Sequence, residues 1–341
     1  MVSEQIIKEF NASENTLSFE AMKFVVESQQ ARMRKKGRVF NCEVLERTKH
    51  PENSFLTFLR SLPNKDNFRT QFIYLSALHW SCGDVFIEKG KIRFFLFDAA
   101  NSLYVVFLTI LDILKTLPDS TLYYCGPGIQ KTLSECAYYA IDNALALSKN
   151  EKLHEELAKV DINTPLGPFK TYGEYIRHMF INDPNMRSYI SFSEVLELID
   201  YIKPVPILAI PQSFGSLFKN MQSIEMYNKL VAPRSLQLHN GKPLKDYLET
   251  HTKVVEDKPQ LRGLDHKMAK IKNVALEYQE QQREKVVERN SELPSADHSS
   301  SFPNFLTLHF LNYAEPKYTA PKTSKKDTSE NEVNFSKCSK L

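Results

Sequence analysis

Four side chains of the kinds used in acyl transfer follow one another along the chain as His79, Asp98, Gln130 and Cys136. A nucleophilic thiol needs an adjacent imidazole that takes its proton, and the imidazole needs a carboxylate that fixes its tautomer. A glutamine amide can donate a hydrogen bond to the oxyanion that forms during the reaction. Each residue alone also fits a structural role, since a lone cysteine in an alanine-rich helix is usually a packing residue. The ordered set, rather than any single member, points to a cysteine nucleophile.

The segments around these residues predict the elements that would position them. Runs rich in Phe, Ile, Tyr and Val predict strands at about 71–76, 83–88, 91–98 and 121–125. The sequence EKGK between the second and third runs indicates a hairpin, and the apolar run 103–114 indicates a buried helix that ends before Pro118. A further helix after Thr132, with Ser134 as its N-cap, would place Cys136 in the first turn, where the helix dipole favours a thiolate.

The rest of the chain predicts a helix and a strand within 21–48, proline-broken helices over 150–232, a turn-rich stretch over 235–262 and a long helix over 266–289. The apolar stripe of that long helix would be Met268, Ile271, Ala275 and Tyr278. We therefore expect five segments: a polar N-terminal segment (1–40), a catalytic core (41–150), a helical insert (151–235), a regulatory segment with a basic helix (236–289) and a mostly disordered tail (290–341) with an apolar island at 302–313.

Composition excludes several classes of protein. A chain of 341 residues with 42% hydrophobic and 25% charged residues is neither disordered throughout nor fibrous, and a net charge of +3 does not argue for nucleic acid. The apolar run 103–111 is shorter than the roughly 20 residues of a transmembrane helix, and we expect no secretory signal peptide. Five cysteines (42, 82, 125, 136 and 338) form no CxxC pair, which argues against a zinc site or a disulfide framework.

The ordered motifs resemble those of the YopJ family of bacterial effector acetyltransferases, in the superfamily that also holds ubiquitin-like-protein proteases. HWSCGD provides His79 and Asp84, FLFDAA provides Asp98, and GIQKTLSEC provides Gln130 and Cys136. Further along, LQLHNGKPLKDYLETH (236–251) and DHKMAKIKNVALEY resemble the family's C-terminal segments, so the resemblance covers about 65–280.

Three positions depart from the family pattern. Asp98 stands where Glu is usual in the YopJ pattern and Asp in the proteases. Ala137 replaces the usual Gly after the nucleophile, and Leu238, next to His239, replaces a lysine that is often autoacetylated. Ala137 affects the oxyanion site, and Leu238 affects regulation by autoacetylation.

The resemblance implies an α+β fold with a papain-like cysteine-protease-type core, in which an antiparallel sheet is flanked by helices, plus a mostly helical regulatory region. It implies ping-pong transfer of acetyl from acetyl-CoA, through a thioester on Cys136, to Ser, Thr or Lys of host proteins. A deubiquitinase or SUMO-type protease with the same three residues is the alternative, favoured by the HW dipeptide and Asp98. A catalytically inactive adaptor is a third interpretation, and the presence of all four candidate groups argues against it.

The resemblance also implies secretion, action in the host cell cytoplasm on partners such as signalling kinases or immune proteins, and activation by inositol hexakisphosphate. A polyanion of this kind needs arginine forks and lysine charges. The candidate ligands are Arg69, Arg234, Lys242, Lys245, Lys267 and Lys270. Five cations within residues 32–38 fit either a solvated helix end or another anion site.

Overall fold

A computed structural model describes residues 8–10, 16–48, 50, 53–132, 134–159, 177–178, 181–182, 211–233, 235–255, 258–261 and 263–291. These residues belong to one compact unit, 1–292. The tail predicted from 290 lies outside the described residues apart from its first two, and so does most of the predicted insert over 151–235.

The core is a five-stranded sheet whose strands lie in chain order. They are β1 (Cys42–Arg47), β2 (Phe68–Ser76), β3 (His79–Glu88), β4 (Lys91–Phe97) and β5 (Thr121–Cys125). The three central strands are antiparallel, whereas β1 pairs with β2 and β4 pairs with β5 in parallel. The predicted strands and the α+β class are confirmed, but the sheet is mixed rather than antiparallel. Its outer strands are parallel because helical crossovers, α3 (Ser54–Ser61) and α4 (Leu103–Thr116), return the chain to the same end of the sheet.

Two-residue turns join the antiparallel strands. Lys89 and Gly90, with φ of 50° and 72°, connect β3 to β4 and confirm the predicted hairpin. Ala77 and Leu78, with φ of 46° and 65°, connect β2 to β3, so that Ser76 pairs with His79. The second turn therefore makes His79 the first residue of β3, at one end of the sheet.

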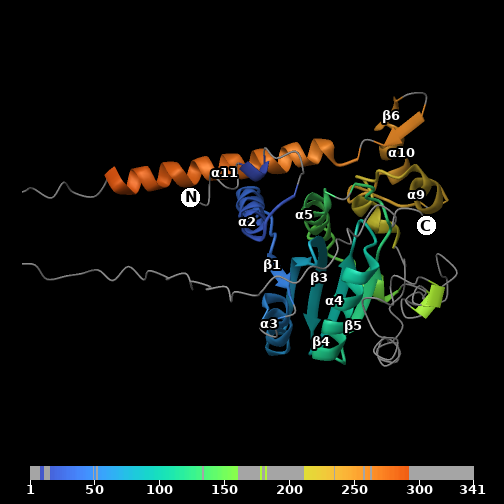
Figure 1. Ribbon diagram of the computed structural model, residues 1–341, viewed down its shortest axis with the longest axis horizontal. Helices are drawn as coiled ribbons and strands as arrows, with labels where there is room; N and C mark the ends of the chain where they lie inside the picture. Colours follow the sequence, from blue (N-terminus) through green and yellow to red (C-terminus); the bar gives the residue numbers. More distant parts are fainter. Residues whose placement is uncertain are drawn as a thin grey trace, which may run out of the picture. The chain divides into compact units, whose positions relative to one another are not determined.

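Alternate residues of the strands pack into two separate cores, one on each face of the sheet. Figure 1 shows the strands with the helices α3 and α4 beside them. Ile73 and Phe95 belong to the core that includes residues of α2 (Phe19–Lys35), α5 (Cys136–Leu147) and α11 (Asp265–Ser291). Their neighbours Phe72 and Phe94 belong to the core that includes α3 and α4. The strands are buried on both faces, which is why they appear as nearly continuous apolar runs in the sequence.

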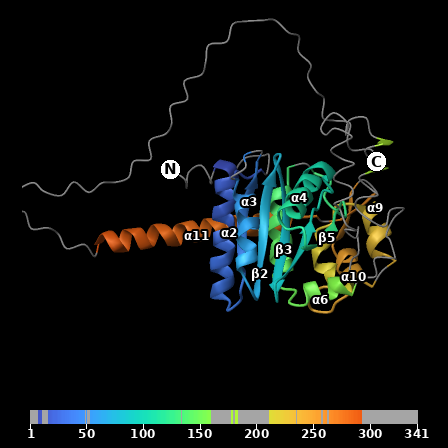
Figure 2. The ribbon, with the colours of Figure 1, turned by 90° about the horizontal axis from the view of Figure 1, so that it is seen from below.

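The long helix α11 confirms the helix predicted over 266–289. Met268, Ile271 and Ala275 are buried, and Tyr278 packs against Phe24 of α2 with ring centroids 5.6 Å apart. The two helices cross beside the sheet (Figure 2), and α11 also contacts α5. The predicted apolar stripe is thus the surface that attaches α11 to the core.

Short elements complete the described chain. They are η1 (Leu62–Asn64), α6 (Leu153–Ala158), η3 (Gln212–Leu217), α9 (Ile224–Met226), η4 (Tyr227–Val231), α10 (Leu244–Glu249) and the antiparallel hairpin of β6 (Thr252–Val255) and β7 (Lys258–Leu261). The sequence predicted only turns over 235–262, because α10 and the two strands are too short to show a periodic pattern. Within the described part of the chain, no helix has the length and apolar character needed to cross a membrane.

Candidate active site

His79, Asp98 and Cys136 come together from three elements. His79 begins β3, Asp98 directly follows β4, and Cys136 is the first residue of α5, which packs against β3. The His79 Nε2 atom lies 2.8 Å from Asp98 Oδ1, and the imidazole also interacts with the Cys136 side chain. The structure therefore holds an imidazole between a carboxylate and a thiol, which is the arrangement of a cysteine nucleophile with its base.

The Asp98 carboxylate is fixed by backbone groups. It is almost fully buried, and it accepts hydrogen bonds from the N–H groups of Ala100 (3.2 Å) and Ser102. Its own N–H donates to the Cys125 carbonyl of β5 at 3.0 Å. Because Asp98 engages Nε2 of His79, the Nδ1 atom is the nitrogen that remains for proton exchange with sulfur.

The charges at the site favour a protonated imidazole. Burial lowers the pKa of His79, but the charge and the hydrogen bond of Asp98, together with Cys136, outweigh burial and raise that pKa to about 10. An imidazolium beside a sulfur atom favours the thiolate, which is the nucleophilic form of cysteine. The site can therefore hold a protonated imidazole beside the Cys136 sulfur at neutral pH.

Asp98→Asn tests the origin of this charge. The amide removes the negative charge that contributes most to raising the pKa of His79, so the pKa is expected to fall well below 10, since only Cys136 then opposes burial. In the parent protein the His79 imidazole should stay protonated at pH 8. In the variant its resonances should show a titration at lower pH. NMR titration of ring-labelled histidine measures this, with Asp112→Asn on α4 as the control. An unchanged His79 titration in the Asp98 variant would contradict the assignment.

Cys136 lies where the sequence predicts, in the first turn of a helix, but the cap differs. The N-cap residue is Glu135, without a side-chain cap hydrogen bond, rather than Ser134. The Glu135 carboxylate instead accepts hydrogen bonds from the Thr132 hydroxyl (2.6 Å) and from the Gln222 amide (2.7 Å). The first-turn N–H groups of α5 are thus not used by a capping side chain, and they supply partial positive charge beside sulfur.

Gln130 lies in the loop that leads to Cys136, held against the strand end that carries Asp98. Its N–H donates to the Ala99 carbonyl at 3.0 Å, and its side-chain amide donates to the Thr132 carbonyl of the same loop. The Gln130 Oε1 atom is buried without a hydrogen-bond partner. An amide nitrogen carries two hydrogens, so one N–H of Gln130 remains for a developing oxyanion.

The other cysteines of the described chain are packing residues. Cys42, Cys82 and Cys125 are buried in the same core as Cys136, and none of these four forms a disulfide. Burial raises the pKa of the Cys42 and Cys82 thiols, which keeps both protonated and unreactive. Cys338 lies outside the described residues.

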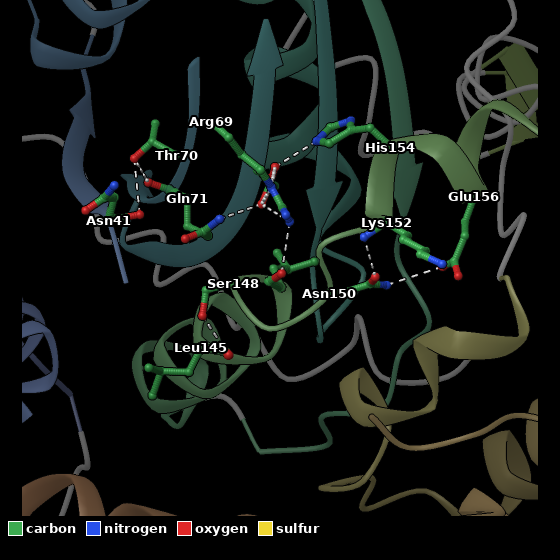
Figure 3. Close-up of polar contacts among 12 residues, drawn as sticks. Asn41, Arg69, Thr70, Gln71, Leu145, Ser148, Asn150, Lys152, His154 and Glu156 are labelled. Atoms are coloured by element: carbon green, nitrogen blue, oxygen red, sulfur yellow. Dashed lines mark hydrogen bonds and ion pairs between the residues drawn. The ribbon is translucent and has the colours of Figure 1, made fainter. Parts of the chain in front are cut away.

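The guanidinium of Arg69, a sequence-predicted anion ligand, is engaged inside the fold. Its Nε and Nη2 atoms bind the fully buried Asp84 carboxylate at 3.0–3.2 Å, and Nη2 also donates to the Leu147 carbonyl at 3.0 Å. Gln71 and His154 reach the same carboxylate at 2.7 Å, as Figure 3 shows for the three side chains that converge there. The motif residue Asp84 therefore ties the sheet to α5 and α6, and Asp98 is the carboxylate that serves His79.

The remaining cation candidates are spread over different surroundings. Lys242 and Lys270 are exposed, and Lys245 is exposed and lies 3.9 Å from Glu249. Arg234 lies outside the described residues. Of the candidates that the structure describes, only Lys267 belongs to a group of cations close enough to perturb one another.

That group, called the basic cluster below, consists of Lys149, Lys219, His239 and Lys267 around the buried Asp142 carboxylate. Both Lys219 and Lys267 place Nζ 3.3 Å from Asp142. Reduced hydration and the charges of Lys219, Lys267 and Arg38 lower the pKa of Lys149 to about 8, although Asp142 opposes this. Reduced hydration and the Lys149 and Lys219 charges lower the pKa of His239 to about 4.

Lys149 and Lys219 were not among the sequence-predicted ligands, and their spacing in the chain carries no signal. The two lysines and the other members of the basic cluster come from separate segments of the chain that only the fold brings together. One carboxylate among several cations leaves an excess of positive charge at this site, which suits a polyanion.

The chain is similar to one protein-family model and to several solved structures. A family model described as YopJ serine/threonine acetyltransferase matches residues 2–289. HopZ1a in complex with IP6 has a similar structure at 12% sequence identity, with 82% of this chain and 91% of that chain covered and a TM-score of 0.49. A deletion variant of AvrA with IP6 and CoA matches at 15% identity, covering 80% of this chain and 96% of that one, with a TM-score of 0.43. No curated protein matches significantly.

Proposed function

Because the chain belongs to the YopJ serine/threonine acetyltransferase family, we propose that it moves an acetyl group from acetyl-CoA to Ser, Thr or Lys side chains of host proteins. The observation that carries this proposal is the His79 imidazole between the Asp98 carboxylate and the Cys136 thiol. We further propose that the protein is a secreted effector that acts in the host cell cytoplasm.

The first half-reaction acylates the enzyme. His79 takes the proton of the Cys136 thiol, and the thiolate attacks the carbonyl carbon of the acetyl thioester. The negative charge that develops on the carbonyl oxygen is stabilised by the free N–H of Gln130 and by first-turn N–H groups of α5. Coenzyme A leaves as its thiol after receiving the proton from the imidazolium, and the acetyl group stays on Cys136.

The second half-reaction transfers the acetyl group to the partner protein. A hydroxyl or amine of the acceptor attacks the thioester while His79 takes its proton. Asp98 keeps the imidazole in one orientation through both half-reactions, since its carboxylate is itself held by the Ala100 and Ser102 N–H groups. Release of the Cys136 thiol regenerates the enzyme.

Inositol hexakisphosphate is proposed as the activator, and the basic cluster as its contact site. A polyphosphate would neutralise the repulsion that lowers the pKa values of Lys149 and His239. Lys267 is retained from the sequence-predicted ligands. Lys242 lies three residues after His239 on the same surface segment and is retained as well.

Lys149→Gln tests the basic cluster. Since a bound polyanion favours charged lysine, binding at pH 8 should raise the pKa of Lys149 above 8 and draw protons from the buffer. The variant should bind inositol hexakisphosphate about tenfold more weakly, equivalent to about 1.4 kcal/mol, and should take up fewer protons. Titration calorimetry in buffers of different ionisation enthalpy measures both, with Lys245→Gln as the control. Equal affinities for the two variants would place the ligand elsewhere.

Intact-mass spectrometry tests the activity itself. The protein is incubated with acetyl-CoA, with and without inositol hexakisphosphate, and in parallel with a reactive ubiquitin or SUMO probe. An acetyl adduct on Cys136 supports the transferase. Capture of the probe without acetyl transfer would favour the protease alternative, and no reaction in either arm, with the inositol phosphate present, would favour an adaptor.

A further inference from the structure

The loop from Gly126 to Glu135, between β5 and the nucleophile, has no helix or strand among its described residues. It carries Gln130, whose amide is the proposed oxyanion donor, and it ends at Cys136. A donor in such a loop needs external support, because a displacement of about 1 Å can cost about 100-fold in rate.

Gln222 provides four hydrogen bonds to this loop from 90 residues further along the chain. Its N–H donates to the Ile129 carbonyl at 2.9 Å. Its Oε1 atom accepts from the N–H groups of Lys131 (2.7 Å) and Thr132 (3.4 Å), and its Nε2 atom donates to Glu135 Oε2 at 2.7 Å. The contacts lie on both sides of Gln130, so one residue holds the loop before and after the donor.

Gln222 is itself held in place. Its neighbours Met221 and Ser223 are buried. Asn220 donates to the buried Asp142 carboxylate at 2.5 Å and accepts the Tyr139 hydroxyl of α5 at 2.7 Å. A Cβ on Gly263, whose φ is +64°, would lie 3.0 Å from Gln222 Cγ, so the side chain packs over that glycine. The segment 220–223 is thus bound to α5 by hydrogen bonds, so it can hold the loop in a fixed position.

We propose that Gln222 is a positioning residue that holds the Gln130 loop in register with Cys136; this inference rests on the proposed acyl-transfer function. Only an amide fits the set of contacts, because the side chain accepts from two N–H groups and donates to a carboxylate. Glutamate at 222 would face the buried Glu135 carboxylate as a like charge, and methionine would leave the loop N–H groups and Glu135 without this partner.

The double replacement Gln222→Glu with Glu135→Gln restores the pattern with donor and acceptor exchanged. Glutamate at 222 still accepts from Lys131 and Thr132. The new amide nitrogen at 135 takes the place of the Oε2 atom that both partners contact, so it donates to the glutamate and to the Thr132 hydroxyl oxygen. A coupling between the two sites is therefore expected, which a double-mutant cycle measures.

Two reactions of Cys136 separate loop positioning from general damage. Acylation by p-nitrophenyl acetate forms an oxyanion, whereas alkylation by iodoacetamide does not. Neither reaction uses acetyl-CoA. Intact-mass spectrometry with acetyl-CoA therefore shows separately whether acetyl-CoA is the acyl donor. In Gln222→Glu and Gln222→Met, the acylation rate should fall about 100-fold or more, as expected when an oxyanion donor is lost from its position, while alkylation stays within about threefold.

The double variant should be acylated at least about tenfold faster than Gln222→Glu. Gln212→Met, in the 3-10 helix η3, is the matched control and should acylate like the parent protein. Acylation within about threefold of the parent in both single variants would overturn the proposal, as would an equal loss of acylation and alkylation. If the single variants do not fold, the double variant decides: parent-like acylation supports the exchange of partners, and a folded but slow double variant overturns it.

Discussion

Cys136→Ala is expected to lower acetyl transfer by at least about 1,000-fold, because alanine removes the atom that carries the acyl group. Intact-mass spectrometry after incubation with acetyl-CoA and inositol hexakisphosphate should show no covalent acetyl adduct in the variant. The fold should survive, since Cys136 is a small side chain at a helix start and its truncation is expected to cost only about 1 kcal/mol.

Cys42→Ala is the matched control for this prediction. Cys42 is buried in the same core, on β1, and burial raises the pKa of its thiol, so it should not react. The control should lose a similar small amount of stability and keep full activity. Near-normal turnover in Cys136→Ala, or loss of the adduct in Cys42→Ala, would remove Cys136 from the role of nucleophile.

Asp84→Ala is expected to destabilise the fold by about 3–5 kcal/mol, the range for removing one partner of a buried ion pair. The Asp84 carboxylate is fully buried, and it receives Arg69, Gln71 and His154 at 2.7–3.2 Å (Figure 3). Alanine would leave the Arg69 charge and two further polar groups without this partner, and it would loosen the attachment of α6 to β3. Urea unfolding followed by circular dichroism measures the loss.

Asp112→Ala is the control, because it removes the carboxylate of an ion pair that lies near the surface. Asp112 of α4 pairs with Arg47 of β1 at 2.6 Å, and both side chains are partly exposed, at 20% and 15%. Water can replace the lost partner there, so the expected cost is about 1 kcal/mol. Equal losses in the two variants would show that the buried network contributes no more than an ordinary ion pair between a helix and the sheet.

Most of the sheet and of the long helices could be predicted because their signals are local. The strands are apolar runs with turn residues between them, and the stripe from Met268 to Tyr278 repeats at the helical period. The parallel outer strands could not be predicted, since strand direction depends on where α3 and α4 pack. The hairpin of β6 and β7 was missed because four residues are too few to show alternation.

The chemical groups of the site and their order are determined by the sequence alone, because motifs such as FLFDAA and LSEC place each residue type at an element end. Two aspartates, Asp84 and Asp98, were then available near His79 along the chain. Asp84 lies five residues further on the same strand, about 17 Å from His79 and on the opposite face of the sheet, so it cannot reach the imidazole. Pairing of β3 with β4 and β4 with β5 brings Asp98 to the imidazole instead.

Only the tertiary structure decided which cations form the basic cluster and which residue holds the loop before the nucleophile. Most charged residues in a sequence run are solvated. Arg69 shows that an arginine in a motif can instead pair with a buried carboxylate. Lys149, Lys219 and Gln222 carry no local pattern, because their partners lie on distant segments. Repulsion between charges and the sharing of hydrogen bonds act through space, so these roles exist only once the chain has folded.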